Sequence, residues 1–433
     1  MIKQFLRKIL GPEGVLLTHR WRGRLAAFLF GYPARQLKVI GVTGTNGKTT
    51  TCFMIAHILQ SAGFRVGMAT TVEFLVGTKR VPNTVKMTTL SPFSLQRLLK
   101  QMVQAGCQYA ILEVTSHAIR QERIFGIPFD TLVFTNLTHD HLDYHQSFED
   151  YRATKVQLFA SHPRLAVVNV DDKSAPHFLR QTADMKLTYG LKGQADVHAA
   201  HVKYGANWTQ LQVAAPGGSA AELALPIPGQ FNVYNALAAI ATVLGMGVPL
   251  TTAIDSLRHF AGVPGRMEKV EAGQPFTVYV DYAHTPDAFQ QIYATIRPAT
   301  SGKIIHVFGA TGDRDKTKRP LLGAIAAKFA DYIVVTDEDP YSEDPLIIME
   351  AVAEGVVRAS RDIRHRKSEG VQFWKILDRR QAIAQAFSLA KRGDIVLLTG
   401  KGAEQVMVVG DRKVPWDDRQ VAREELAKLG YRS

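Results

Sequence analysis

Residues 38–51 join a short apolar strand, a glycine-rich turn and the start of a helix, and this stretch limits the possible folds more than any other. Two glycines let backbone N–H groups approach an anion without a Cβ in the way. A lysine adds a mobile positive charge, and the threonines after it offer hydroxyl groups to Mg²⁺. These residues are Gly44, Gly47, Lys48, Thr49 and Thr50. The stretch predicts a nucleotide-phosphate site in a protein of the α/β class.

The composition favours a protein that binds anions. The chain has 433 residues, and its 52 basic and 39 acidic side chains give a formal net charge of +13. This charge suits nucleotides, UDP-sugars, nucleic acids or lipid surfaces, without choosing among them. Two cysteines are too few for a disulfide framework. No stretch approaches the roughly 20 apolar residues of a membrane span. We therefore expect a soluble, cytoplasmic protein.

The order of apolar strands and helices predicts three parts. Residues 1–36 form a basic helical segment, residues 37–262 a central domain with a mainly parallel sheet, and residues 263–433 a Rossmann-like α/β domain. Short antiparallel hairpins are expected between about residues 195 and 228. Residues 1–30 carry apolar side chains at helical spacing beside basic ones, and could lie on an anionic membrane. We favour the alternative that they form a helix packed on the protein.

Two strands of the central domain end in side chains that could bind a metal. Glu113 closes one strand, and ligands of a parallel sheet gather at the carboxyl ends of its strands. Its carboxylate could therefore bind Mg²⁺. The next strand leads into a segment that contains His139, His141 and His145. These histidines invite a zinc interpretation, but no motif with zinc-ligand spacing completes such a site.

Lys155 lies within the apolar stripe of a predicted helix. The helix begins near Ser147, and at 100° per residue Tyr151, Leu158 and Phe159 share one face with Lys155 in its middle. An unpaired ammonium group that points inward would be costly. From the residues alone, we expect a lysine that extends past the apolar edge to solvent.

Together these segments resemble the Mur ligase family, the ATP-dependent amide-forming enzymes that extend the peptidoglycan stem peptide. The loop at residues 43–49, Thr-Gly-Thr-Asn-Gly-Lys-Thr, resembles the short phosphate loop of that family, whereas the general P-loop would need glycine where Val42 stands. Residues 113–118 and 136–145 resemble the MurE-type ligases, the UDP-N-acetylmuramyl-tripeptide synthetases. The resemblance implies ATP and Mg²⁺ as cofactors and a carbamylated Lys155. It implies metal ligands at Thr49, Glu113, His141 and Lys155.

The resemblance also implies roles for other residues. The expected catalytic residues are Lys48, Glu113, His141 and Lys155. The expected nucleotide contacts add Thr43, Thr45, Asn46, Asn235, Arg266 and Asp281 to the loop residues named above. The expected contacts of a muramyl-peptide acceptor are Thr88, Thr89, Ser116, Gln121 and Arg123. Met87 and Leu90 flank the two threonines where the family commonly has asparagine and proline.

Residues 337–345 correspond to the segment that reads Asp-Asn-Pro-Arg in enzymes selecting meso-diaminopimelate. Asp339 replaces the asparagine and Tyr341 the arginine, which removes a bidentate clamp for the distal carboxylate. Gly400 and Glu404 match the glycine and the glutamate that bind the distal end of diaminopimelate in those enzymes. An anionic pair of Asp339 and Glu404 would suit a distal ammonium group such as that of lysine, so we expect a diamino acid.

The resemblance begins at Lys38. MurE-type ligases carry a UDP-binding domain of roughly a hundred residues before the loop, whereas 42 residues precede Thr43 here. UDP recognition is therefore not carried over, and the acceptor could be a UDP-sugar peptide, a lipid-linked peptide or another γ-carboxylate peptide. We expect a monomeric, ADP-forming amino-acid ligase that works through an acyl phosphate and does not bind nucleic acid. The alternatives are a folylpolyglutamate-synthase-like ligase and, from another class, a P-loop kinase or nucleotide switch.

Overall fold

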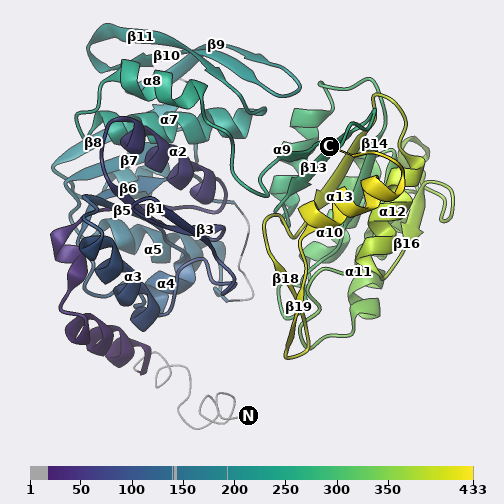
Figure 1. The fold of residues 1–433 in the computed structure, drawn as a ribbon, viewed down its shortest axis with the longest axis horizontal. Helices are drawn as coiled ribbons and strands as arrows, with labels where there is room; N and C mark the ends of the chain where they lie inside the picture. The colour runs from purple at the N-terminus through teal and green to yellow at the C-terminus, as the bar shows by residue number, and fades with distance from the viewer. Residues whose placement is uncertain (1–17, 139, 141–143, 193, 433) are drawn as a thin grey trace.

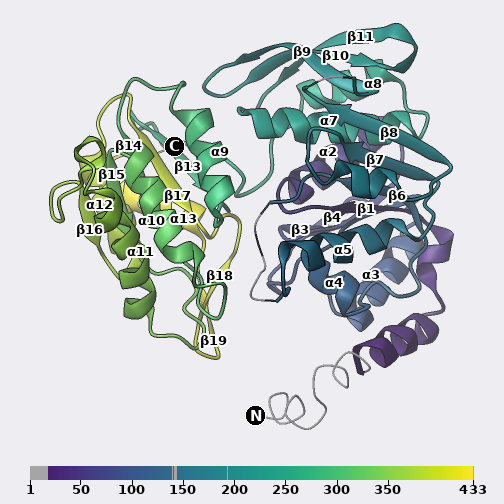
Figure 2. The same ribbon diagram turned by 180° about the vertical axis from the view of Figure 1, so that it is seen from behind.

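The computed structural model describes residues 18–138, 140, 144–192 and 194–432, which form two α/β halves (Figure 1). One half is built on an 11-stranded sheet and the other on a six-stranded sheet. The view from behind shows the halves side by side, each with helices packed around its own sheet (Figure 2). The predicted α/β class, with a mainly parallel central sheet and a second α/β unit, is confirmed.

The larger sheet places the phosphate loop near its centre. Its strands are β1 (Lys38–Thr43), β2 (Val66–Ala69), β3 (Glu73–Val76), β4 (Lys79–Pro82), β5 (Tyr109–Glu113), β6 (Phe129–Phe134), β7 (Leu165–Asn169), β8 (Met185–Gly190), β9 (Val197–Tyr204), β10 (Thr209–Ala215) and β11 (Ser219–Leu225). The order across the sheet is β11-β10-β9-β8-β7-β6-β1-β5-β2-β3-β4, and β1 is parallel to both neighbours. The predicted hairpins are β9 to β11, whereas the hairpin of β3 and β4 is not among the predicted elements.

Helices cover both faces of this sheet. They are η1 (Pro33–Gln36), α2 (Lys48–Ser61), α3 (Pro92–Gln104), α4 (Ser116–Arg120), α5 (Phe148–Phe159), α6 (Ala175–Leu179), α7 (Gln230–Leu244) and α8 (Leu250–Arg258), while η2 (Pro216–Gly218) forms the turn between β10 and β11. Successive residues of β1 point to opposite faces, so Ile40 and Val42 join the core with α2 and α7, and Val39 joins the core with α3 and α5. The side chain of Ser147 caps α5 by accepting the Asp150 N–H at 3.1 Å, which confirms the predicted helix start.

The smaller sheet directs three site residues toward the larger one. Its strands are β12 (Glu268–Val270), β13 (Thr277–Asp281), β14 (Ile304–Phe308), β15 (Tyr332–Val335), β16 (Phe373–Lys375) and β17 (Ile395–Thr399), with a separate hairpin of β18 (Val406–Val409) and β19 (Arg412–Pro415). The helices are α9 (Pro286–Ile296), α10 (Lys318–Phe329), α11 (Pro345–Ala359), η3 (Ile363–His365), α12 (Arg379–Leu389) and α13 (Asp418–Lys428). Strands β13 to β17 are parallel. Asp281 ends β13, Asp339 follows β15 and Gly400 follows β17, so all three leave the sheet at its carboxyl edge.

The chain enters the larger half through a helix. Residues 18–29 are helical and are followed by η1, while the amphipathic spacing expected earlier in the chain falls on residues 1–17, outside the described residues. Within the part of the chain that the structure describes, no helix is long and apolar enough to cross a bilayer. The predicted boundary near residue 262 falls between α8 and β12.

Candidate active site

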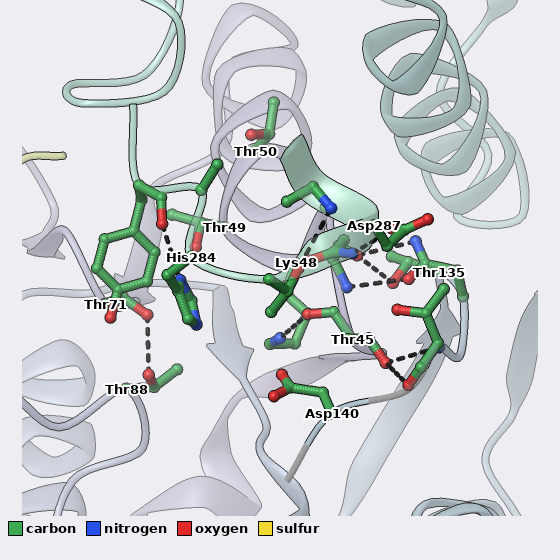
Figure 3. Close-up of a pocket in the computed structure, with 18 of the residues that line it drawn as sticks. Thr45, Lys48, Thr49, Thr50, Thr71, Thr88, Thr135, Asp140, His284 and Asp287 are labelled. Atoms are coloured by element: carbon green, nitrogen blue, oxygen red, sulfur yellow. Dashed lines mark hydrogen bonds between the residues drawn. The ribbon is translucent and has the colours of Figure 1, made fainter. Parts of the chain in front are cut away.

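A cavity of about 650 Å³ lies where the two halves face each other. Figure 3 shows Thr45 and Lys48 of the phosphate loop together with His284 and Asp287 of the second half. The side-chain amide of Asn46 donates to Asp287 Oδ2 at 2.9 Å, which links the halves directly. The cavity is therefore a cleft that both halves build.

Two positions of the phosphate loop accept no residue other than glycine. Gly44 has a φ of +150°, and a Cβ there would lie 1.9 Å from Thr135 Oγ1. Gly47 has a φ of +82°, and a Cβ there would lie 2.3 Å from Asn235 Oδ1. L-residues with side chains rarely adopt these backbone conformations. The loop is thus held between the segment after β6 and helix α7, with the N-terminus of α2 behind it.

Lys48 and Lys155 direct their ammonium groups at the same carbonyl oxygen. Each Nζ lies 3.0 Å from Gly44 O; Lys48 also donates to Thr45 O at 2.7 Å, and Lys155 to Thr43 Oγ1 at 3.3 Å. Lys155 is 1% exposed, so the expectation that it extends to solvent is wrong. Burial, and after it the charge of Lys48, lowers the pKa of Lys155 well below its usual value. A second positive charge is therefore disfavoured here.

Oxygen atoms suited to Mg²⁺ gather beside the loop. Thr49 Oγ1 donates to Glu113 Oε2 at 3.0 Å, and the same carboxylate oxygen accepts the N–H and the Oγ1 of Thr71 at 2.9 and 3.0 Å. Glu113 is 3% exposed, and Asp140 lines the same cavity (Figure 3). A carboxylate beside a threonine hydroxyl at a phosphate loop fits a magnesium ion.

The histidine-rich segment gives no support to a zinc centre. His145 is buried, with Nε2 2.9 Å from Ser116 Oγ and Nδ1 3.3 Å from Asp150 Oδ2. Among the residues that the structure describes, no three histidine, cysteine or carboxylate side chains gather in a way that could hold a metal ion. His139 and His141 lie outside those residues. The metal role predicted for His141 therefore stays a prediction.

The predicted nucleotide contacts of the two halves meet at the loop. Arg266 donates through Nη2 to Thr49 Oγ1 at 3.2 Å, and its guanidinium lies 4.3 Å from the centre of the Tyr282 ring. Asp281 accepts two backbone N–H groups, at 2.6 and 2.7 Å, one of them from the residue after Arg266. These bonds hold the turn that carries Arg266. Asn235 reaches the loop from α7, where it packs against the second loop glycine.

The residues predicted for the acceptor form a hydrogen-bonded patch beside the Glu113 carboxylate. Thr88 Oγ1 accepts from Thr71 Oγ1 at 2.9 Å, and Thr89 Oγ1 donates to Glu113 O at 2.9 Å. Arg123 donates to Thr89 O at 3.0 Å and to Gln121 Oε1 at 2.8 Å. Since Arg123 and both threonines line the cavity, an acceptor carboxylate held by them would lie near the phosphate loop.

Four charged side chains from the two halves meet at one end of the cavity. Lys86, between β4 and α3, places Nζ 2.5 Å from Asp339 Oδ2 and 3.0 Å from Glu404 Oε2. Lys401 Nζ lies 2.9 and 2.8 Å from the same two oxygens. Burial lowers the pKa of Lys86, although Glu404 opposes it. The predicted anionic pair of Asp339 and Glu404 is therefore balanced by two ammonium groups, a correction to the sequence-based picture. We call these residues the four-charge cluster.

Two family models match this chain, the Mur ligase middle domain over residues 42–243 and the "Mur ligase, glutamate ligase domain" over residues 265–402. A UDP-N-acetylmuramyl-tripeptide synthetase from Roseiflexus sp. (strain RS-1) is 44% identical over 423 residues, which is 94% of this chain and 82% of that protein. The chain belongs to the Mur ligase family. Mur ligases are ATP-dependent, ADP-forming amide ligases that use Mg²⁺.

Other comparisons support the tripeptide-synthetase branch of this family. A UDP-N-acetylmuramoyl-L-alanyl-D-glutamate--2,6-diaminopimelate ligase from Bacillus velezensis is 41% identical, covering 94% of this chain and 81% of that protein. A solved structure of a ligase with the same name has a TM-score of 0.63 at 32% identity, and the match covers 95% of this chain and 83% of that chain. The structure of Mycobacterium tuberculosis folylpolyglutamate synthase has a TM-score of 0.71 at 19% identity, and the match covers 88% of this chain and 92% of that chain. At this identity the match shows a shared fold alone. The comparisons therefore favour the Mur ligases over the folylpolyglutamate-synthase and kinase alternatives.

Most of the predicted site residues of this Mur ligase line the cavity. They are Thr45, Asn46, Gly47, Lys48, Thr49, Thr50, Thr88, Thr89, Glu113, Arg123, Asn235, Arg266, Asp281, Asp339, Tyr341, Gly400 and Glu404. Five others do not line it: Thr43, Gly44, Ser116, Gln121 and Lys155. Lys155 contacts Thr43 and Gly44, Gln121 contacts the lining residue Arg123, and Ser116 contacts His145.

Sequence reasoning missed three charged residues of this Mur ligase site. Lys401 lies inside the Gly400 to Glu404 motif, and Asp287 lies in the first turn of α9, so both had local signals. Lys86 had none, because its partner Asp339 is 253 positions away.

Proposed function

We propose that this Mur ligase is a tripeptide synthetase that joins a diamino acid to a muramyl-dipeptide-like acceptor with ATP. The identity to such enzymes over 94% of the chain supports the reaction class. The observation that carries the proposal is the shared cavity, in which the phosphate loop, the acceptor patch and the four-charge cluster all take part. Three substrates can therefore meet in one place.

The proposed reaction has two steps. The acceptor carboxylate attacks the γ-phosphorus of ATP, which forms an acyl phosphate and releases ADP. The amine of the amino acid then attacks the acyl carbon, the amide bond forms, and phosphate leaves. Mg²⁺, held by Thr49 and Glu113, would neutralise phosphate charge when bound. Lys48 and Arg266 place positive charge at the same phosphates, and apposition of the two halves keeps water from the acyl phosphate.

We also infer that Lys155 is carbamylated in the working enzyme. A carbamate forms when a neutral amine attacks CO₂ and loses a proton, and the lowered pKa of Lys155 favours the neutral amine. The product is an anion near Lys48, so the positive charge that Lys48 carries when protonated attracts the carbamate, whereas it disfavours an ammonium group on Lys155. The carbamate oxygens would be suited to a second Mg²⁺.

The remaining parts of the proposal concern assembly and location. We infer a monomer, because both halves of the site come from the same chain. Both cysteines are buried free thiols, which suits the reducing cytoplasm. We also infer that residues 1–30 contact a membrane surface.

Phosphate release from ATP and Mg²⁺ tests the proposed reaction. The acceptor is UDP-MurNAc-L-Ala-D-Glu, and lysine, meso-diaminopimelate and ornithine are supplied in turn. We expect release that requires both the acceptor and one diamino acid. Phosphate release that is the same with and without an amino acid would contradict the proposal. If wild-type protein binds ATP but no amino acid supports release, the muramyl nucleotide is the wrong acceptor, and lipid-linked peptides would be tested next.

The Lys86→Met variant should favour amino acids that end in an ammonium group. In the wild type, Lys86 occupies the two carboxylate oxygens that a distal ammonium would need. Without it, Lys401 alone faces Asp339 and Glu404, and the cluster carries one net negative charge. The ratio of kcat/KM for lysine over meso-diaminopimelate should rise roughly tenfold, the effect of one charged hydrogen bond.

A control for this variant is Lys413→Met, because Lys413 also reaches across the halves, donating to Thr84 O at 3.4 Å, but lies outside the four-charge cluster. The control should keep the wild-type ratio. An unchanged ratio in Lys86→Met would show that the distal ammonium binds elsewhere.

A further inference from the structure

The helix of residues 18–29 packs on the protein with its small side chains. Gly23, Ala26 and Ala27 are buried. The large apolar side chains face solvent and are 63, 50, 70 and 60% exposed at Trp21, Leu25, Phe28 and Leu29. A surface helix usually turns its large apolar residues toward the core. The reversed pattern leaves an outward apolar stripe, formed by these four residues, for another surface.

Close contacts fix the inward face of this helix. A Cβ on Gly23 would lie 2.7 Å from the Glu122 carbonyl oxygen, so the two backbones touch. Arg20 Nε lies 2.8 Å from Glu122 Oε1, and the Arg24 guanidinium lies 5.6 Å from the centre of the Phe125 ring. The helix therefore cannot rotate to bury its large residues without losing these contacts.

Arginines border the apolar stripe on both sides. At 100° per residue, Trp21 and Leu25 lie in its middle, with Arg22 on one side and Arg24 on the other. Residues 18–29 contain three arginines and no acidic residue. Large apolar side chains, tryptophan among them, with basic residues beside them are typical of helices that lie in the membrane interface. The charge favours an anionic lipid surface over an apolar protein groove.

The helix also lies where docking leaves the active site open. In both views it projects from the half with the 11-stranded sheet, on the side of α3 and α4 and away from the six-stranded sheet (Figures 1 and 2). The cavity lies between the two halves. A surface that meets the helix would therefore not cover the cavity.

We propose that this helix docks the protein on a bilayer surface that contains anionic phospholipids. The apolar stripe enters the boundary between headgroups and acyl chains, and Arg22 and Arg24, which border the stripe, contact lipid phosphates. The proposal specifies the membrane contact inferred above, and it does not depend on the ligase reaction.

Co-sedimentation of the full-length protein with unilamellar vesicles, without ATP or amino acid, tests the proposal. Vesicles of phosphatidylglycerol and phosphatidylcholine should bind the protein, and phosphatidylcholine alone should bind it at least about tenfold less. Added salt should weaken binding, because it screens the arginines. The variant Leu25→Ser/Phe28→Ser should bind anionic vesicles at least about tenfold less than wild type.

The matched control removes two exposed apolar side chains from the other half. Ile347 and Ile363 are 63 and 82% exposed, and Ile347→Ser/Ile363→Ser should bind vesicles as wild type does. Tryptophan emission supplies a second measurement, which starts from the wild-type protein. It should shift to shorter wavelength with anionic vesicles, and the shift should be lost in Trp21→Phe, which keeps the other three tryptophans.

Three results would overturn the proposal. Wild-type protein could fail to bind anionic vesicles, or Leu25→Ser/Phe28→Ser could bind them as well as wild type. Light scattering could instead show a wild-type dimer that this variant converts to a monomer, in which case the stripe joins two copies of the chain. Failure of the ligase assay would leave all of these measurements unaffected.

Discussion

The Lys48→Ala variant should lose at least about a thousandfold in kcat, or ~4 kcal/mol of transition-state stabilisation, because its ammonium group is the loop's mobile positive charge at the transferring phosphoryl group. Its Nζ now donates to Gly44 O and Thr45 O, so it already lies over the loop. Burial lowers the pKa of Lys48, although Glu113 opposes it, so alanine should cost little folding stability. Phosphate release and thermal unfolding together separate the two effects.

A control for this variant lies at the other end of the same strand. Lys38 is exposed and begins β1, whereas Thr43, at the other end of β1, leads into the loop. Lys38→Ala should keep wild-type turnover. If Lys48→Ala kept a tenth or more of the wild-type kcat, the loop would not be the site of phosphoryl transfer.

Local patterns predicted the framework of the site, because each signal lay within a few residues. The strand, the glycine turn and the helix of residues 38–51 follow one another in the structure as in the sequence. The cap of α5 could be predicted because Ser147 and its partner Asp150 are only three positions apart in the sequence. Hairpins β9 to β11 were indicated by short alternating segments. In each case local chemistry and global packing favour the same structure.

Long-range charge pairing could not be predicted in this way. Asp339 and Glu404 suggested an anionic pocket, because sequence spacing does not reveal which cations approach from another domain. Lys86 supplies one of them from 253 positions away from Asp339, and Lys401 the other from within a recognised motif. The pocket's charge was therefore misjudged even though its residues were correctly named.

The orientation of the helix at residues 18–29 could not be predicted from apolar spacing. The large residues of an amphipathic helix are expected to point inward, yet Gly23 lies against the backbone at Glu122 and Trp21 faces solvent. The small side chains on one face of the helix let its backbone approach the protein closely, so this face packs inward. Apolar spacing alone cannot distinguish a helix that packs on the protein from one that presents its apolar face to another surface.

The Lys155→Ala variant should be about as inactive as Lys48→Ala, with a loss of about a thousandfold or more in kcat, if the carbamate rather than the amine is the working group. Lys155 is 1% exposed and donates to Thr43 Oγ1 and Gly44 O. Because this position is closed to solvent, an ion from solution cannot take over the role of the lost side chain in the variant. Lys155→Arg separates the alternatives, because arginine keeps a positive charge but does not form a carbamate under these conditions.

The carbamate hypothesis predicts that both Lys155 variants are inactive and that wild-type protein stripped of CO₂ loses activity until bicarbonate is added. The exposed lysine of α3 provides the control, since Lys100→Ala should respond to bicarbonate as wild type does. Carbon-13 NMR with labelled bicarbonate should show a carbamate signal in wild type and Lys100→Ala and none in the Lys155 variants. An active Lys155→Arg enzyme would show instead that a buried cation is what the loop requires. Because the lowered pKa of Lys155 favours the neutral amine that reacts with CO₂, the signal should fade as acid protonates the amine.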